Sequence, residues 1–227
     1  MTAGLHGYGA GVRVDVLTAE RPTWRGVFHM WAFWAAIPAG LLLILFADQP
    51  RARMAAAIYA ASLLLAFGTS SAYHRLAKSY RARKIMQRAD HSMISLLIAG
   101  TYVPICLVAL PLGWGITIVS IVGGLAVLGI ALKMLAFSRL QWLSYALYLI
   151  MGWAAVIATP VLIDHLTPLQ LGLMAAGGVA YTVGVPILLL RRPDPWPSVF
   201  GYHEIWHGFT VLAAALHFSA VALVVRG

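Results

Sequence analysis

The chain has 227 residues, of which 61% are apolar and only 10% are charged, and its mean hydropathy is +0.84. This composition excludes an ordinary soluble domain and is typical of an integral membrane protein. The net charge of +9 does not indicate a nucleic-acid binder, because the basic residues lie between long apolar segments and form no aromatic-interleaved surface. We therefore expect membrane lipids, and no nucleic acid, as partners.

Seven stretches are long and apolar enough to cross a bilayer, which needs roughly 20 residues per helix. We expect these spans at 28–46, 54–73, 91–110, 115–132, 141–163, 169–190 and 203–225. The predicted class is an all-α integral membrane protein, in which residues 1–27 form an N-terminal segment and residues 28–227 a single seven-helix transmembrane domain. The composition leaves its oligomeric state open.

The distribution of lysine and arginine predicts the orientation of these spans. One side of the membrane would hold 13 of these residues and the other side only 3, Arg51, Arg53 and Arg226. The positive-inside rule then places the N-terminus in the cytoplasm and the C-terminus outside. The basic run from Arg75 to Arg88, "RLAKSYRARKIMQR", is interpreted mainly as this orientation signal. Binding of anionic lipid headgroups is the alternative interpretation.

Ionisable residues in spans are costly, so each one indicates a candidate site. The alternating topology brings three helix ends to the cytoplasmic boundary. Span two ends at His74, span three begins beside Asp90, and span seven begins with His203 and His207. These four residues should therefore lie at one membrane depth.

Their chemistry predicts a metal site. His203 and His207 lie four apart on one helical face and can bind the same ion. His74 would complete a three-histidine set with a fourth position left for water, as in catalytic zinc sites. Asp90 would bind through that water or accept its proton. Zinc is the preferred metal, and iron, copper and nickel remain alternatives for such ligands.

Other polar residues near this boundary have two interpretations each. Ser70 lies one turn before His74 and would contact the bound water or an oxyanion, or else bond to its own helix. His29 would orient a ligand or lie in an interfacial aromatic belt. His217, deeper in the last span, is interpreted as a packing residue.

The stretch "HEIWH", residues 203–207, has the spelling of a zinc-peptidase helix. Such peptidases need a later ligand, but no Asp or Glu follows His207. The third ligand must come from upstream, which excludes that peptidase class. Glu204 points about 100° away from His203 around the helix, so we expect it beside the site or at headgroup level rather than as the base.

Taken together, these motifs resemble the hemolysin III family of bacterial membrane proteins, relatives of the progestin and adiponectin receptors and, more distantly, of alkaline ceramidases. The resemblance covers nearly the whole chain. Its motifs are "RPTWRGVFH", "SSAYH", "RADHSMISLLIAGTYVP" and "HEIWHGF". It implies a multi-pass protein of the bacterial inner membrane, with zinc on His74, His203 and His207 near the cytoplasmic face and with Asp90 and Ser70 around the bound water.

Two functions follow as hypotheses. The first is a zinc-dependent hydrolase of a lipid amide or ester, with Asp90 and Ser70 as catalytic residues. The second is a non-enzymatic membrane protein, either lytic or involved in membrane homeostasis, in which a structural zinc joins spans two, three and seven. An ion transporter is disfavoured, because the spans carry no acidic residue at mid-depth.

Overall fold

In the computed structural model, residues 21–137 and 140–227 are described, and they form helices joined by short connections. The elements are α2 (Val27–Leu45), α3 (Pro50–Leu76), α4 (Tyr80–Pro104), the π-helix η1 (Ile105–Ala109), α5 (Leu112–Ala136), α6 (Gln141–Trp153), the 3-10 helix η2 (Ala154–Ala158), α7 (Thr159–His165), α8 (Pro168–Leu190) and α9 (Tyr202–Val225). Within this part of the chain, seven helical spans are long and apolar enough to cross a membrane. The predicted seven-helix class is confirmed.

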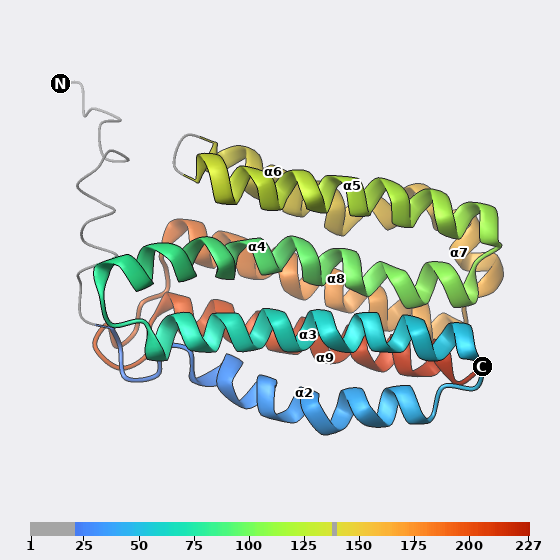
Figure 1. The fold of residues 1–227 in the computed structure, drawn as a ribbon, viewed down its shortest axis with the longest axis horizontal. Coiled ribbons are helices and arrows are strands. Elements are labelled where there is room, and N and C mark those ends of the chain that lie inside the picture. The colour runs from blue at the N-terminus through green and yellow to red at the C-terminus, as the bar shows by residue number, and fades with distance from the viewer. Residues whose placement is uncertain (1–20, 138–139) are drawn as a thin grey trace.

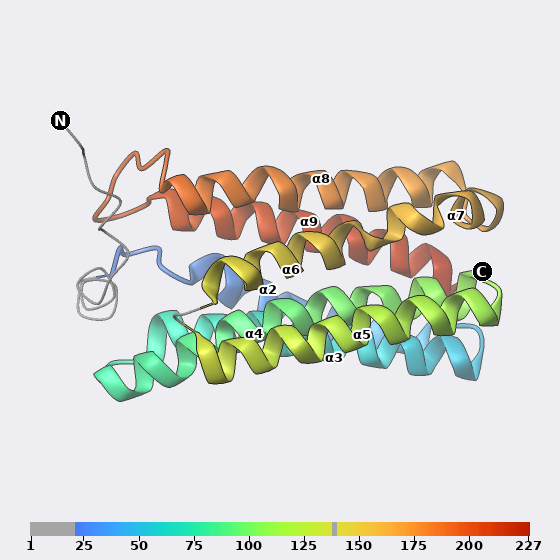
Figure 2. The same cartoon turned by 90° about the horizontal axis from the view of Figure 1, so that it is seen from above.

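The spans lie along the long axis of the molecule as an up-and-down bundle (Figure 1). Helix α3 packs on α2 and α4, α5 packs on α4 and α6, α8 packs on α9, and α9 also packs on α2. Contact between α6 and α8 is much sparser. In the view of Figure 2, α8 and α9 lie on one side of the molecule and α3, α4 and α5 on the other, and α9 also contacts α3 and α4. The bundle is therefore a ring whose weakest side lies between α6 and α8.

Small residues allow the helices of this ring to approach closely. Ala55 and Ala56 of α3 and Ala213 of α9 are fully buried. A methyl group on Gly40 of α2 would lie 2.9 Å from the methyl group of Ala60 on α3. The bundle surface, by contrast, exposes large apolar side chains such as Trp31 and Leu135. Small interior and large apolar exterior residues are the pattern of a membrane bundle, in which packing rather than apolar burial holds helices together.

The third span begins much earlier than expected. Helix α4 starts at Tyr80, where the hydroxyl of Ser79 accepts a hydrogen bond from the amide of Ala82, and not at residue 91. Hydropathy detects only the apolar part of the span, whereas the helix continues through the basic run beyond it. Asp90 consequently lies about 15 Å along α4 rather than at its start.

The fifth span is interrupted, since α6 gives way to η2 before α7 begins. Tyr102 of α4 supports this break, because its hydroxyl donates to the carbonyl of Met151 at 2.8 Å and accepts from the amide of Ala155 at 2.9 Å. A backbone group freed within a membrane needs such a partner. One side chain from α4 therefore stabilises the irregular turn of its neighbour.

Helix α3 ends, and α4 and α9 begin, at the same end of the bundle, opposite the C-terminus (Figure 1). We call it the histidine end, because His74 and His203 lie there. Its orientation toward the cytoplasm and the predicted domain boundary at residue 27 stay predictions. Residues 1–20 of the predicted N-terminal segment lie outside the described residues.

Candidate metal centre

Three histidines from two helices meet at the histidine end. His74 comes from the last turn of α3, and His203 and His207 come from the first two turns of α9. One ring nitrogen from each lies within 4.8 Å of the others. His74 and His207 are buried, and His203 is partly buried. The three residues predicted as ligands are thus brought together in an arrangement that could hold a metal ion.

The distance between His74 and His203 suits a small tetrahedral ion. Nε2 of His203 lies 3.2 Å from Nε2 of His74. Two nitrogens that each lie about 2.0–2.1 Å from one tetrahedral zinc are about 3.3 Å apart. The donor set, three imidazoles and no thiolate, also suits zinc and other borderline metals.

Asp90 lies beside these histidines. Its Oδ2 atom is 3.9 Å from Nε2 of His74 and 3.8 Å from Nδ1 of His91. Both distances exceed direct hydrogen-bond length, so the carboxylate lies at the edge of the set rather than within it. Ser70, one turn from His74 on α3, is also buried and lines the same pocket as Asp90.

His29 connects α2 to both partner helices. Its Nδ1 lies 2.7 Å from the Ser70 hydroxyl, its Nε2 lies 2.8 Å from the Thr210 hydroxyl, and its ring stacks on His207 with centroids 3.7 Å apart. Thr210 donates to the carbonyl of His207, so it accepts from Nε2–H of His29. In a neutral His29 ring, Nδ1 then accepts from Ser70. Of its two interpretations, these contacts favour the one in which His29 orients a ligand.

The segment before α2 clamps the histidine end. Arg21 donates to the carbonyls of Tyr73 and His74 at 2.7 and 2.5 Å, and so caps the end of α3. Gly26 has φ of +78°, and a Cβ placed on it would lie only 2.6 Å from Cβ of His74. Both the positive φ and the short distance to His74 require glycine at this position. The close approach fixes the chain against the backbone that carries His74.

Glu204 is fully buried and has a structural position. Its carboxylate bonds to Arg25 and accepts the amide of Gly201 at 2.8 Å, which caps the start of α9. These contacts hold the turn that carries His203. Glu204 thus joins the segment before α2 to the start of α9.

Sequence reasoning missed Arg21, Arg25 and Thr210 as contributors to this region. Thr210 had a detectable signal, since it lies three residues after His207 on the same helical face. The two arginines had none beyond their place in the "RPTWRGVFH" motif, because their contacts depend on how the chain enters α2. His217 bonds through Nε2 to the Met174 carbonyl at 3.1 Å, at the far end of the pocket.

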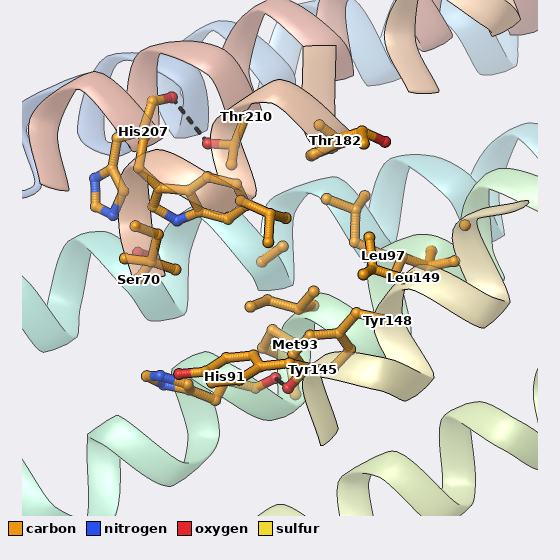
Figure 3. A pocket seen from close by; sticks show the side chains of 18 of the residues that line it. Ser70, His91, Met93, Leu97, Tyr145, Tyr148, Leu149, Thr182, His207 and Thr210 are labelled. Carbon is orange, nitrogen blue, oxygen red and sulfur yellow. Dashed lines mark hydrogen bonds between the residues drawn. The ribbon is translucent and has the colours of Figure 1, made fainter. Parts of the chain in front are cut away.

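A pocket of about 220 Å³ extends from the histidines into the bundle between α4, α6, α8 and α9. Ser70, Asp90, His203 and His207 line its histidine end. Its deeper wall is apolar and aromatic, with Met93, Leu97 and Leu149 among the side chains in Figure 3. Trp153 donates to the hydroxyl of Thr182 at 3.1 Å across the sparse α6–α8 side. The arrangement places polar side chains, among them histidines that could hold a metal ion, at one end of an apolar cavity.

Comparisons with known proteins agree with this architecture. The family described as Haemolysin-III related matches residues 17–218. The chain is 35% identical to Hemolysin-3 of Bacillus cereus, over 84% of this chain and 85% of that protein. It is 33% identical to a Hemolysin-3 homolog of Bacillus subtilis (strain 168), over 91% and 95%. It is also 33% identical to Heptahelical transmembrane protein 3 of Arabidopsis thaliana, over 69% of this chain and half of that protein. This multi-pass membrane chain belongs to the Haemolysin-III related family.

Proposed function

We propose that this chain is a zinc-dependent hydrolase that cleaves an amide or ester bond of a lipid in the bacterial inner membrane. His74, His203 and His207 would bind the zinc, and the histidine end would face the cytoplasm. The lipid is both its substrate and its partner. Hydrolysis is the reaction class that best combines an imidazole-rich metal site, a nearby carboxylate and an apolar cavity.

One observation carries the proposal. His203, His207 and Asp90 line one end of a 220 Å³ apolar pocket within the membrane-spanning helices, and His74 lies beside these two histidines. A lipid chain can be buried in such a cavity, while its polar linkage remains beside the histidines. A purely structural metal would not need this pocket.

Each site residue then has a chemical task. When bound, zinc supplies Lewis acidity toward a carbonyl group and toward water. Asp90, at the edge of the histidine set, accepts a proton from the attacking water and returns it to the leaving group. The apolar wall excludes other water from the reacting bond.

Ser70 and His29 position this machinery. The Ser70 hydroxyl is hydrogen-bonded to His29, which stacks on His207 and bonds to Thr210. Ser70 would stabilise an oxyanion only after its hydroxyl turned away from His29 toward the pocket.

The test is fatty-acid release by zinc-loaded protein in lipid nanodiscs, measured by mass spectrometry on a panel of N-acylated and O-acylated lipids. Asp90→Asn should lower the rate about 100-fold or more while zinc content is kept. Failure to release fatty acid from every lipid would refute the proposal, as would an unchanged rate in Asp90→Asn.

A second candidate comes from the relatives, two of which are named for hemolysis. In this alternative the metal joins α3 to α9 and the protein lyses membranes without catalysis. Lysis of erythrocytes that persists in Asp90→Asn but is lost in His74→Ala would favour it over the hydrolase.

A further inference from the structure

A second cavity, of about 290 Å³, lies at the histidine end on the side of the segment that precedes α2. We call it the basic vestibule. Among the residues that the structure describes, its lining consists of Arg21, Pro22, Thr23, Arg25, His74, Arg75, Ala77, Lys78 and Arg83. Five of these nine residues are arginine or lysine, and none is acidic. His74 thus borders this vestibule, whereas His203 and His207 border the apolar pocket.

Three of the cations are held in place by the protein. Arg21 bonds to the end of α3, Arg25 is paired with Glu204, and Nε of Arg83 donates to the carbonyl of Ala77 at 3.2 Å. They therefore form a fixed basic frame around the cavity. Burial lowers the pKa of Arg21, and the charges of Arg83 and Arg25 also act to lower it. A group of like charges in a partly enclosed space favours occupation by an anion.

Two further cations lie on the rim. Arg75 and Lys78 are exposed, and within the described part of the chain neither is paired with a carboxylate. Guanidinium groups bind phosphate oxygens through paired N–H bonds, and an ammonium adds a compact charge. The vestibule combines both donor types around a space large enough for a headgroup.

We infer that the basic vestibule binds an oxyanion of phosphate type, supplied by an anionic lipid headgroup or by free phosphate, on the opposite side of His74 from the apolar pocket. Such a site is more specific than the positive-inside signal that orients the spans, because it uses only some of the basic residues. Of the six basic residues in the run 75–88, only Arg75, Lys78 and Arg83 line the vestibule, while Arg81, Lys84 and Arg88 do not. The inference does not rest on hydrolysis or on a bound metal.

The chain offers a charge-matched control for this assignment. Arg75→Gln/Lys78→Gln removes two vestibule cations, and Arg81→Gln/Lys84→Gln removes two exposed cations of α4 that lie outside the vestibule. Both pairs lower the net charge equally. All four side chains are exposed, so both double variants should fold like the parent.

The experiment measures the thermal unfolding midpoint of the full-length protein in nanodiscs. One arm titrates inorganic phosphate against chloride at equal ionic strength in phosphatidylcholine discs. The other arm compares phosphatidylcholine discs with and without phosphatidylglycerol. Stabilisation in the first arm identifies free phosphate as the source, and stabilisation confined to the second identifies a lipid headgroup. The vestibule variant should weaken the effective affinity about tenfold or more, and the control variant should leave it within about twofold.

A measurement on the unmodified protein supplements the variants. A water-soluble ester acylates exposed lysine amines, and an anion that occupies the vestibule nearly all the time should slow the acylation of Lys78 at least about fivefold. The acylation rate of Lys84, outside the vestibule, should not change. Mass spectrometry measures both rates. The inference is overturned if neither anion stabilises the protein, if both double variants lose the effect equally, or if Lys78 and Lys84 are protected alike.

Discussion

Arg25 and Glu204, 179 positions apart in the chain, form an ion pair in which Nε of Arg25 lies 2.5 Å from Oε1 of Glu204. Glu204 is fully buried, and its second oxygen caps the amide of Gly201. The pair therefore joins the segment before α2 to the turn of α9 that carries His203. Its energetic role can be measured directly.

Removing Arg25 should leave a buried carboxylate without its counter-charge. We expect Arg25→Met to cost about 3 kcal/mol, which corresponds to a fall in the thermal midpoint of roughly 6–12 °C. Circular dichroism of the detergent-solubilised protein measures this shift. Glu204→Gln can still accept the Gly201 amide, so the double variant should recover much of the loss. If Arg25→Met/Glu204→Gln instead lost as much stability as the sum of the losses in Arg25→Met and Glu204→Gln, the pairing would be contradicted.

The histidine set predicts a specific loss of metal. His74→Ala, His203→Ala and His207→Ala should each reduce bound zinc by at least about tenfold, because each removes one of three protein ligands. Elemental analysis of the purified proteins measures the content. His217→Ala is the control, since His217 lies ten residues beyond His207 on α9 and bonds to Met174 instead. Equal zinc content in all four variants would exclude this set as the binding site.

His29 should affect metal affinity without being a ligand. His29→Leu removes the bonds to Ser70 and Thr210 and the stack on His207, so it should weaken zinc binding about 10–100-fold. Competition with a chromogenic chelator gives the dissociation constant. His217→Leu makes the same change of side chain elsewhere in the bundle and should leave the constant unchanged. An unaltered constant in His29→Leu would show that these contacts do not position His207.

Gly26 tests the clamp around His74. Alanine there must adopt a positive φ and displace the His74 side chain, so we expect Gly26→Ala to destabilise the protein by about 2 kcal/mol or more. It should also weaken zinc binding. Gly124, in the interior of α5, has open space around its Cβ position. Gly124→Ala should leave the thermal midpoint unchanged or raise it slightly. Similar losses in both variants would argue against the clamp.

The meeting of His74, His203 and His207 could be predicted because alternating spans bring specific helix ends to one side of the membrane. That argument uses depth alone and needs no side-chain detail. It could not predict that His29 stacks on His207, because rotation of α2 about its own axis is determined by packing against α3 and α9. The Arg25–Glu204 pair was unpredictable for a similar reason, since it depends on the path of the chain before α2.

Lys133 shows where hydropathy misleads. The sequence placed it at the break between spans four and five, but α5 continues to Ala136 and buries Lys133 completely. Its ammonium lies 4.9 Å from the ring centroids of both Phe137 and Tyr145. Aromatic faces can stabilise a cation away from water, so charge alone does not mark the end of a helix.

His74 and His203, whose Nε2 atoms lie 3.2 Å apart in the candidate metal centre, are 129 positions apart in the chain, on α3 and α9. During synthesis α3 enters the membrane while α9 has not yet been made, and domains form from the N-terminus onward. A nascent chain that lacks α9 therefore presents a single imidazole of the three and could not hold a metal ion with this set. Any metal ion held by these three histidines would consequently be captured late in biogenesis, and its presence would distinguish a completed bundle from a prematurely terminated one.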